Sequence, residues 1–177
     1  CIDSTADSTV HVMPNGRPDF TWDSICIDRP VQFINRSNEN GSLQVNYTWK
    51  FNNGGTDFFV KNPPPVTYAN PGIIDVTLLL SAFGCENYPD SIIRKVQVNK
   101  PKEGIRYKDI TYPEGATVYI HARGDSVGNI FQWIPRVQLS TYNSRYTQFT
   151  AIDDVKYFIY ITDPHTCITV DTMQLLV

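Results

Sequence analysis

The sequence predicts an all-β protein made of two tandem β-sandwiches. Tyr, Phe and Trp make up 12% of the 177 residues, and Pro, Gly, Asn, Thr and Ser are common, a composition typical of strands joined by turns. We find no stretch of ten or more residues with apolar positions at helical spacing, whereas runs that alternate with a period of two are frequent. Short strands with turn signals about every 8–12 residues are typical of an antiparallel sandwich.

A repeat divides the chain into modules. Cys1, Cys85 and Cys167 are each followed by an Asp-Ser or Asp-Thr pair and then a strand-like run, and they lie 84 and 82 residues apart. Trp49 and Trp133 are also 84 residues apart. A fixed period of this length indicates tandem modules. We therefore expect the last strand of a preceding module at 1–14, one sandwich at 15–100 and a second at 101–177.

The first complete module contains four strand-like runs. They alternate apolar and polar residues or are continuously apolar, and they cover 31–35, 45–51, 73–80 and 92–98. Segments rich in Asn, Gly, Ser and Pro separate them. Pro63 to Pro65 lack the backbone N–H that a central strand needs, so we expect them in a loop.

The second module contains five strand-like runs of the same kind. These cover 116–122, 130–135, 146–151, 156–162 and 172–177. Pro101 and two lysines interrupt the pattern near 98–104, which is the expected linker between the modules.

Three aromatic residues are expected in the cores. Alternation along 45–51 places Trp49 on the same side as Phe51, and Trp133 has the matching position in the second module, so both indoles should pack between the sheets. Stacking of these indoles on carbohydrate is the less favoured alternative. Tyr157 follows Asp153-Asp154 ahead of an apolar run, as in the tyrosine corner of sandwich domains, where the hydroxyl bonds nearby backbone.

Composition excludes several classes of protein. Charged residues make up 19% of the chain and the net charge is −3, without a basic stripe, so nucleic-acid binding is disfavoured. No apolar run approaches the roughly 20 residues of a membrane-spanning helix. His11, His121 and His165 are dispersed, without metal-ligand spacing, and no catalytic motif is present. We therefore expect no enzyme, no catalytic or metal-binding residues and no cofactor.

Residues 31–85 carry the strings VQFINRS, YTWKFNNGG and NPPPVTYANPGIIDVTLLL. In this order they resemble a polycystic kidney disease (PKD) repeat. The matching residues are Val31, Phe33, Asn35, Ser37, Tyr47, Trp49, Phe51, Pro64, Tyr68, Gly72, Val76 and Leu78. The departures are Lys50, Asn52 and Asn53 at the acidic and glycine positions of the signature loop, Val66 for a histidine and Ile74 for a tyrosine.

The second module contains FQWIPRVQLS and KYFIYITDPHTCITVDTMQLLV. It is similar to the immunoglobulin-like domain that often follows PKD repeats in large secreted proteins of gliding bacteria, ahead of a C-terminal sorting domain. The resemblance implies an extracellular, cell-surface location and a non-enzymatic role as a spacer or adhesive unit. The implied partners are flanking domains of the same chain, with polysaccharide or another surface protein as further candidates.

The cysteines suggest one disulfide within the chain. A bond between Cys26 and Cys85 would join opposite ends of a sandwich, about 25 Å apart for eight-residue strands, whereas a disulfide needs Cα atoms within about 7 Å. End-to-end stacking of the modules would instead bring Cys167 near Cys26. We take Cys26 and Cys167 as the candidate pair, with free thiols throughout as the open alternative.

Two short motifs have both a functional and a structural interpretation. Arg123-Gly124-Asp125 spells an integrin-binding tripeptide, but Gly and Asp after a strand also suit a turn, which we favour. Asp-Ser or Asp-Thr before an apolar residue or Thr resembles the O-glycosylation motif of the same bacterial group. Ser91, Ser126 and Thr172 are the resulting candidate acceptors, and turn chemistry is the alternative.

Exposed aromatics are the remaining functional indication. Phe58, Tyr68 and Tyr142 lie in tracts whose aromatic residues cannot all point inward, so they are candidates for a ligand-contact surface. The favoured function is a spacer or adhesion module pair of a multidomain surface protein. The main alternative is a carbohydrate-binding accessory module of a secreted polysaccharide-degrading enzyme.

Overall fold

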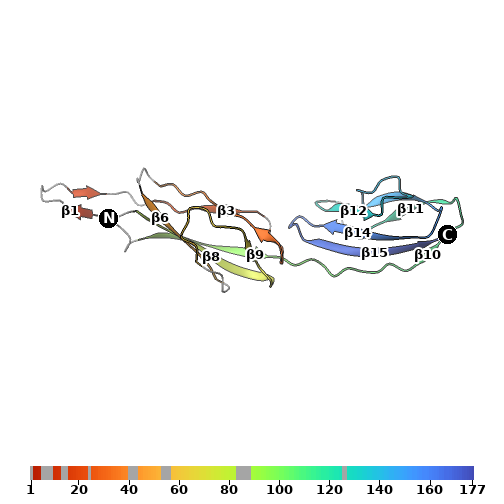
Figure 1. Cartoon of the computed structure of the whole chain (residues 1–177), viewed down its shortest axis with the longest axis horizontal. Helices are drawn as coiled ribbons and strands as arrows, with labels where there is room; N and C mark the ends of the chain where they lie inside the picture. Colours follow the sequence, from red (N-terminus) through yellow and green to blue (C-terminus); the bar gives the residue numbers. More distant parts are fainter. Residues whose placement is uncertain are drawn as a thin grey trace. The chain divides into compact units, whose positions relative to one another are not determined.

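The computed structural model of the chain describes residues 2–4, 10–12, 16–23, 25–39, 44–52, 57–82, 89–124 and 127–177. The chain divides into two compact units, Cys1–Val98 and Asn99–Val177. Every regular element of the described residues is a β-strand, numbered along the chain in Figure 1. The predicted all-β class is therefore confirmed. Cys1, Cys85 and Ser126 lie outside the described residues.

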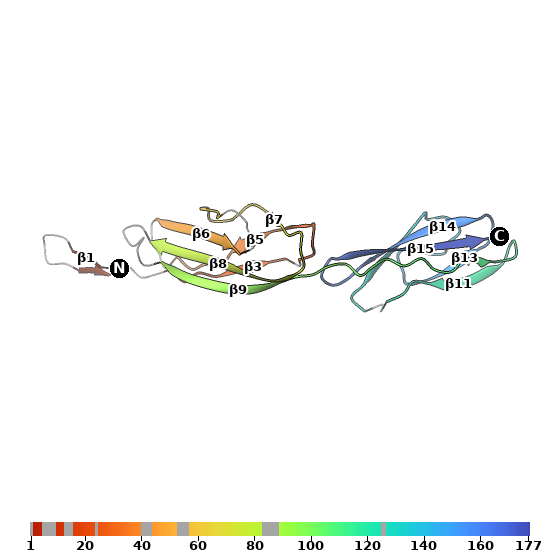
Figure 2. The ribbon, with the colours of Figure 1, turned by 90° about the horizontal axis from the view of Figure 1, so that it is seen from below.

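The first unit packs one antiparallel sheet against shorter strand pairs. The sheet is formed by β6 (Val45–Phe51), β8 (Gly72–Ala82) and β9 (Asp90–Val98), with β8 in the centre. β3 (Phe20–Trp22) pairs with β5 (Phe33–Asn35), and β4 (Pro30–Val31) pairs with β7 (Val66–Thr67). Figure 2 looks onto the larger sheet, with β8 between β6 and β9.

Alternation along these strands forms the core of the first unit. On β8, Val76 and Leu78 are fully buried, while the residue between them is partly exposed. They face an aromatic cluster in which the rings of Phe20 and Trp49 lie 5.2 Å apart and those of Phe33 and Phe51 lie 5.1 Å apart. Aromatic rings therefore dominate the hydrophobic area between the two layers.

The predicted strand 31–35 is divided in two. β4 and β5 pair with different partners, and Gln32 between them belongs to neither strand. The Gln32 side-chain amide donates to the carbonyl of Pro63 at 2.9 Å, which ties the proline segment to the sheet layer. Pro64 and Pro65 lie outside any strand, as does Pro63.

The N-terminal segment also differs from the expectation. β1 (Ile2–Ser4) and β2 (Val10–Val12) pair antiparallel with each other, so two short strands occur where the sequence suggested one. Apolar and β-branched residues on either side of a polar stretch allow each flank to form its own strand. That this segment belongs to a preceding module stays a prediction.

The second unit is a sandwich of a four-stranded and a two-stranded sheet. The larger sheet has the order β10 (Ile110–Thr111), β15 (Ile168–Leu176), β14 (Val155–Thr162) and β12 (Ile130–Ile134). The smaller consists of β11 (Thr117–His121) and β13 (Tyr146–Thr150). All pairings are antiparallel except that of β10 with β15, which is parallel. β10 was not predicted, because two residues leave no periodic pattern.

The core of the second unit is centred on three aromatic rings. Trp133, Phe149 and Tyr157 have no exposed surface. The Tyr157 ring meets Trp133 edge-on at 5.7 Å and Phe149 edge-on at 6.3 Å. Ile159 and Leu175 complete the contact between the sheets. Edge-to-face packing of this kind adds to the free energy gained by burying the rings.

Candidate functional site

The indoles of Trp49 and Trp133 stabilise their units by equivalent burial and hydrogen bonding. Neither has exposed surface. The Nε1–H of Trp49 donates to the carbonyl of Val60 at 3.1 Å, and that of Trp133 donates to the carbonyl of Ser144 at 2.8 Å, each eleven residues further along the chain. A buried indole that is packed and hydrogen-bonded in this way has no face available for a sugar.

Tyr157 also has a structural role. Its hydroxyl donates to the carbonyl of Val137 at 2.7 Å, and burial raises the pKa of the phenol. The acceptor lies 20 residues upstream rather than a few residues before the strand. The bond to backbone has the expected chemistry, but it connects β14 to the segment after β12 rather than closing a local tyrosine corner.

Arg123 and Asp171 form a charged pair inside the second unit that we did not single out from the sequence. The guanidinium contacts both carboxylate oxygens, at 2.8 Å to Oδ2 and 2.9 Å to Oδ1. Asp171 has no exposed surface, and its Oδ1 also accepts the backbone N–H of Ile105 at 2.9 Å. Arg123 additionally donates to the carbonyl of Glu103. A signal was present, because Asp171 occupies an inward position in the alternating strand 168–176.

The pair with Asp171 also affects the Arg-Gly-Asp tripeptide, because it binds the arginine of that motif. The Arg123 guanidinium is held by Asp171 and by the Glu103 carbonyl, so it is not free to reach a receptor. Asp125 lies outside the described residues. Arg123 therefore has a structural role, whereas the turn that we favoured for Gly124 and Asp125 stays a prediction.

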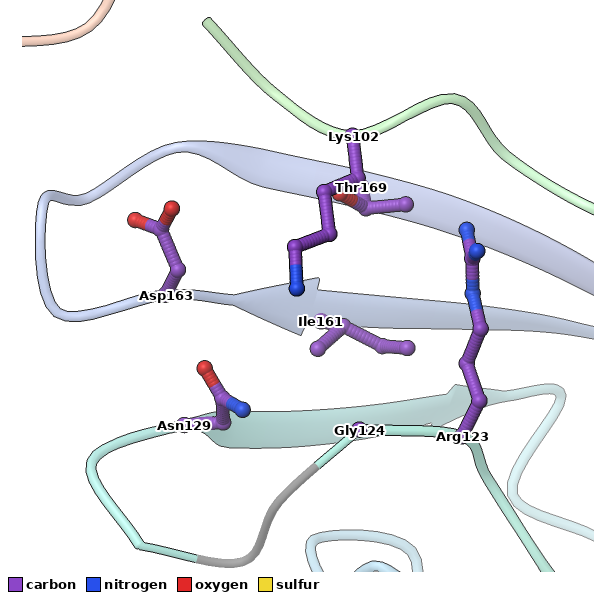
Figure 3. A pocket seen from close by; sticks show the side chains of 7 residues that line it. All are labelled: Lys102, Arg123, Gly124, Asn129, Ile161, Asp163 and Thr169. Atoms are coloured by element: carbon purple, nitrogen blue, oxygen red, sulfur yellow. The ribbon is translucent and has the colours of Figure 1, made fainter. Parts of the chain in front are cut away.

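A small pocket lies beside the pair. It is lined by Lys102, Arg123, Gly124, Asn129, Ile161, Asp163 and Thr169 and has a volume of about 110 Å³. Figure 3 shows the Lys102 side chain extending over Ile161, between Asp163 and Arg123. One carboxylate oxygen of Asp163 is already hydrogen-bonded: its Oδ1 accepts the backbone N–H groups of His165 and Cys167, both at 2.9 Å.

The size of the pocket limits what it can hold. At about 30 Å³ of liquid volume per water molecule, 110 Å³ corresponds to roughly three or four waters. Sites for drug-sized ligands measure roughly 300–1,000 Å³. The lining residues include neither a cysteine nor a histidine. The pocket therefore suits a few waters or a small ion better than a substrate.

The outer surface of the β11–β13 sheet is a better candidate for ligand contact. Tyr119 is 76% exposed and Tyr146 is 53% exposed. His121 lies directly opposite Tyr146 in the register, with the ring centroids 5.7 Å apart, and the Arg145 guanidinium lies 4.9 Å from the Tyr146 ring centre. We call Tyr119, His121 and Tyr146 the outer aromatic face. Its neighbours Thr117, Gln148 and Thr150 are polar and uncharged.

The sequence contained the signal for this face. In TVYIH (117–121), Val118 and Ile120 alternate with Thr117, Tyr119 and His121. Only the first set can face the core of a two-layer sandwich, so Tyr119 must point outward. We did not draw that conclusion from the sequence.

The three aromatics proposed for ligand contact differ in exposure. Tyr68 is only 6% exposed, so its assignment to a contact surface is corrected: the ring packs in the core of the first unit. Phe58 is half-buried against the same core, and its ring meets Phe51 edge-on at 5.9 Å. Tyr142 is 40% exposed, with the Arg136 guanidinium 4.2 Å from its ring centre. Tyr142 is the most exposed of the three, and ligand contact by Tyr142 or Phe58 stays a prediction.

Tyr68 has an unusual environment. Its hydroxyl is buried and has no hydrogen-bond partner among the described residues. Burial raises the pKa of this phenol to about 12. A buried polar atom without a partner costs free energy, so Tyr68 is a weak point in the first unit.

Both described cysteines belong to disulfides. Cys26 is 2% exposed and Cys167 is 1% exposed, and each is disulfide-bonded. The alternative of free thiols is therefore excluded for these two residues. That they bond to each other stays a prediction.

The candidate glycan acceptors lie on strands. Ser91 is exposed on β9. Thr172 is partly exposed on β15, and its backbone N–H donates to the Ile105 carbonyl at 2.8 Å while its carbonyl accepts the Tyr107 N–H. Asp-Ser and Asp-Thr at these two positions are therefore parts of strands rather than of turns.

The described ranges contain neither a cluster of metal ligands nor a membrane-spanning helix. Within them, no group of three or more His, Cys, Asp or Glu residues is placed to hold a metal ion. Within the same ranges, the chain forms no helix of the length and hydropathy needed to span a membrane.

Comparisons with known proteins identify similar folds only. No family model matches the chain, and no curated protein matches it. The PKD1 domain of the Vibrio cholerae metalloprotease PrtV matches with 21% identity and a TM-score of 0.42, covering 49% of this chain and 99% of that domain. A structure of carbohydrate-binding modules from the β-sandwich superfamily matches with 13% identity and a TM-score of 0.44, covering 83% of this chain and 54% of that one.

Immunoglobulin domains also resemble the chain. The N-terminal four Ig domains of Dscam1 isoform 6.9 match with 10% identity and a TM-score of 0.35, covering 93% of this chain and 53% of that one. The chain thus spans about half the length of the carbohydrate-binding and Dscam1 structures. Because all three TM-scores are below 0.5, the β-sandwich architecture rests on the strand pairing described above.

Proposed function

We propose that the chain is a non-catalytic pair of extracellular modules that serves as a load-bearing spacer within a larger surface protein. Two buried cysteines in disulfides suit an oxidising, extracellular environment. The most conspicuous side chains, Trp49, Trp133 and Arg123, are used to stabilise the fold. Its partners are then the flanking domains of the same chain.

The parallel pairing of β10 with β15 carries this proposal. Ile110 lies opposite Leu175 and Thr111 opposite Leu176, and an additional parallel bridge joins Arg106 to Thr172. The segment through which the chain enters the second unit therefore runs alongside the strand through which it leaves, in the same direction. Tension applied to the two ends of the unit pulls these strands along their axes in opposite directions.

This geometry loads several hydrogen bonds together. The backbone bonds from Tyr107 to Thr172 and from Tyr112 to Leu176 lie across the direction of pull, so they must break together rather than one after another. The Asp171 carboxylate strengthens the connection, since it binds Ile105 on the entering segment and Arg123 on the segment after β11. Resistance to forced unfolding depends on the unfolding rate, and bonds that break together slow that rate.

Single-molecule pulling tests the proposal. The protein for both experiments is a Cys26→Ala, Cys167→Ala variant, so that no disulfide carries the load around β10. With handles at the two termini of this chain, we expect the second unit to unfold at clearly higher force than with handles at Asp153 and Val177. The second geometry peels β15 away from β14 one residue pair at a time, since Val155 lies opposite Leu175. The bonds are the same in both experiments and only the direction of load changes, so equal unfolding forces would overturn the load-bearing function.

An adhesive or carbohydrate-binding function is the second candidate, and the outer aromatic face favours it. Exposed tyrosine rings can stack on the apolar faces of sugars, and the neighbouring Thr and Gln side chains can bond their hydroxyl groups. An array of plant, fungal and microbial polysaccharides tests this function. Specific binding that is lost in Tyr119→Ala with Tyr146→Ala, but retained in Ile130→Ala on the opposite sheet, would support it. An absence of binding would remove the polysaccharide as a partner.

A further inference from the structure

Among the described residues of the second unit, no strand pairs with one edge of the β11–β13 sheet. β13 is paired on both sides, because Ser140 donates to the Gln148 carbonyl and Thr150 donates to the Gln138 carbonyl, while its other side pairs with β11. β11 pairs with β13 alone among the described residues. Val118, which points inward, is only half-buried, as expected for a strand that lacks a neighbour on one side.

The register identifies the unpaired backbone groups. Ala151 donates to the Ala116 carbonyl and Ala122 donates to the Arg145 carbonyl, so the carbonyl of 116, the N–H of 122 and both polar groups of 118 and 120 point toward β13. Hydrogen bonding alternates along an antiparallel strand. The N–H and C=O groups of Thr117, Tyr119 and His121 therefore point to the open edge.

The first unit shows a strand bound at the corresponding edge. There, the segment that precedes the tryptophan strand consists of β4 and β5. β4 is paired on one side by β7, and β5 is covered on the other side by β3, with Phe20 opposite Asn35 and Trp22 opposite Phe33. In the second unit the entering segment pairs with β15 instead, and the edge of β11 remains open. The fold thus accommodates an antiparallel strand at this position.

β11 also lacks the devices that normally protect an edge. Exposed edge strands usually carry lysine, proline or a bulge that prevents pairing with another chain. The sequence Thr117–His121 contains none of Lys, Arg, Asp, Glu or Pro, and its five residues pair in unbroken register with β13. Two copies of this strand can therefore approach each other without repulsion between like charges.

We propose that the open edge of β11 binds the same edge of a second copy of the chain, in an antiparallel arrangement with twofold symmetry. With Tyr119 opposite Tyr119 of the other copy, Thr117 lies opposite His121 on each side of the axis. The free N–H and C=O groups of these three residues then bond each other, and the two exposed Tyr119 rings form an aromatic cross-strand pair. Such a contact is small, so we expect a dissociation constant of about 1 mM, in the range of weak encounters.

Weak pairing of this kind becomes effective when many copies lie on one surface. Modules displayed side by side encounter each other at high effective concentration, so several weak contacts act together. This inference does not depend on the load-bearing function, because the open edge lies on the sheet that does not contain β10 and β15.

Sedimentation equilibrium of the full chain, with its disulfides intact, tests the proposal between about 0.01 and 1 mM. We expect a monomer–dimer equilibrium that Tyr119→Lys weakens at least tenfold, because lysine at the centre would face a lysine of the other copy. Ile130→Lys is the matched control: Ile130 is 69% exposed on the other sheet, and the dimer should persist in this variant.

Amide hydrogen exchange supplies a second measurement that does not require a substitution. Protection of the Thr117, Tyr119 and His121 amides should rise with protein concentration, whereas that of Val118 and Ile120 should not change. A chain that stays monomeric throughout the range would overturn the proposal. So would a dimer that Ile130→Lys abolishes and Tyr119→Lys leaves unchanged.

Discussion

Arg123 binds both carboxylate oxygens of Asp171, at 2.8 and 2.9 Å, and this carboxylate has no surface exposed to solvent. The pair therefore joins the segment after β11 to β15 in the interior of the second unit. An isolated charge at this depth would be strongly unfavourable, so the two side chains depend on each other.

Removing the guanidinium should destabilise the second unit. We expect Arg123→Met to lower the free energy of unfolding by about 3 kcal/mol, because it leaves Asp171 charged and buried, while the partial exposure of Arg123 keeps the loss at the lower end of the usual range. Chemical denaturation measures the change. Arg106→Met, which removes an exposed pair with Asp109, should cost less than about 1 kcal/mol. Equal losses in the two variants would contradict a buried role for Arg123.

The two tryptophans should respond alike to substitution. Trp49→Ala and Trp133→Ala each remove a fully buried ring and its hydrogen bond, so each should cost about 3–5 kcal/mol. Thermal unfolding of the purified variants checks this, with Tyr142→Ala at a 40% exposed ring as the control. Near-native stability of either Trp variant would mean that its indole is not a core residue.

Tyr68 offers a stabilising substitution. Its buried hydroxyl lacks a partner, so Tyr68→Phe should keep or raise the free energy of unfolding at pH 7, by up to about 1 kcal/mol. The folded pKa of about 12 lies above the ordinary tyrosine pKa of about 10, so between these values the folded state retains the phenolic proton that the unfolded state loses. The stability associated with Tyr68 is therefore fully present below about pH 10 and is lost toward pH 12.

The difference in stability between the original chain and Tyr68→Phe above pH 10 reports on Tyr68 alone. Denaturation curves of the original chain and of Tyr68→Phe should separate further as the pH rises from 10 to 12, since only the original chain has this ionisation. Curves that remain parallel across this interval would show that the Tyr68 hydroxyl is not buried.

Glu39 should contribute to stability at neutral pH but not in acid. Hydrogen bonds from Lys61, at 2.6 Å, and from the Tyr47 hydroxyl lower the pKa of this carboxyl. Its stabilisation is present above the unfolded pKa and is lost as the pH falls through the lower folded value. Because the Lys61 side chain is 60% exposed, we expect Glu39→Gln to cost less than about 1 kcal/mol at pH 7 and nothing near pH 2. Asp57→Asn, at an exposed position, serves as the control for a general charge effect.

The disulfide prediction can be settled chemically. Proteolysis under non-reducing conditions, followed by mass spectrometry, should yield a peptide pair that contains Cys26 and Cys167. A Cys26–Cys85 peptide would replace the predicted bond with one inside the first unit. Alkylated Cys26 would show that its disulfide does not form in the purified protein.

The sequence alone was sufficient to predict the longer strands, the repeat and the buried indoles. These properties depend on local alternation and on the spacing of large aromatic residues, which follow directly from the pleat of a strand and from the hydrophobic effect. Trp49 and Trp133 were therefore placed in the cores, and both are fully buried.

Tertiary structure decided which polar and aromatic residues are available for other roles. Tyr68 and Tyr142 are both aromatic residues in loop-rich segments, yet one is buried and the other exposed, because exposure depends on distant neighbours. The binding of Arg123 by Asp171 joins residues 48 positions apart. The edge of β11 is open because residues 110–111 pair with β15 and not with β11. The inward position of Asp171 follows from local alternation, but the partner of a side chain and the pairing of a segment are determined by the whole fold.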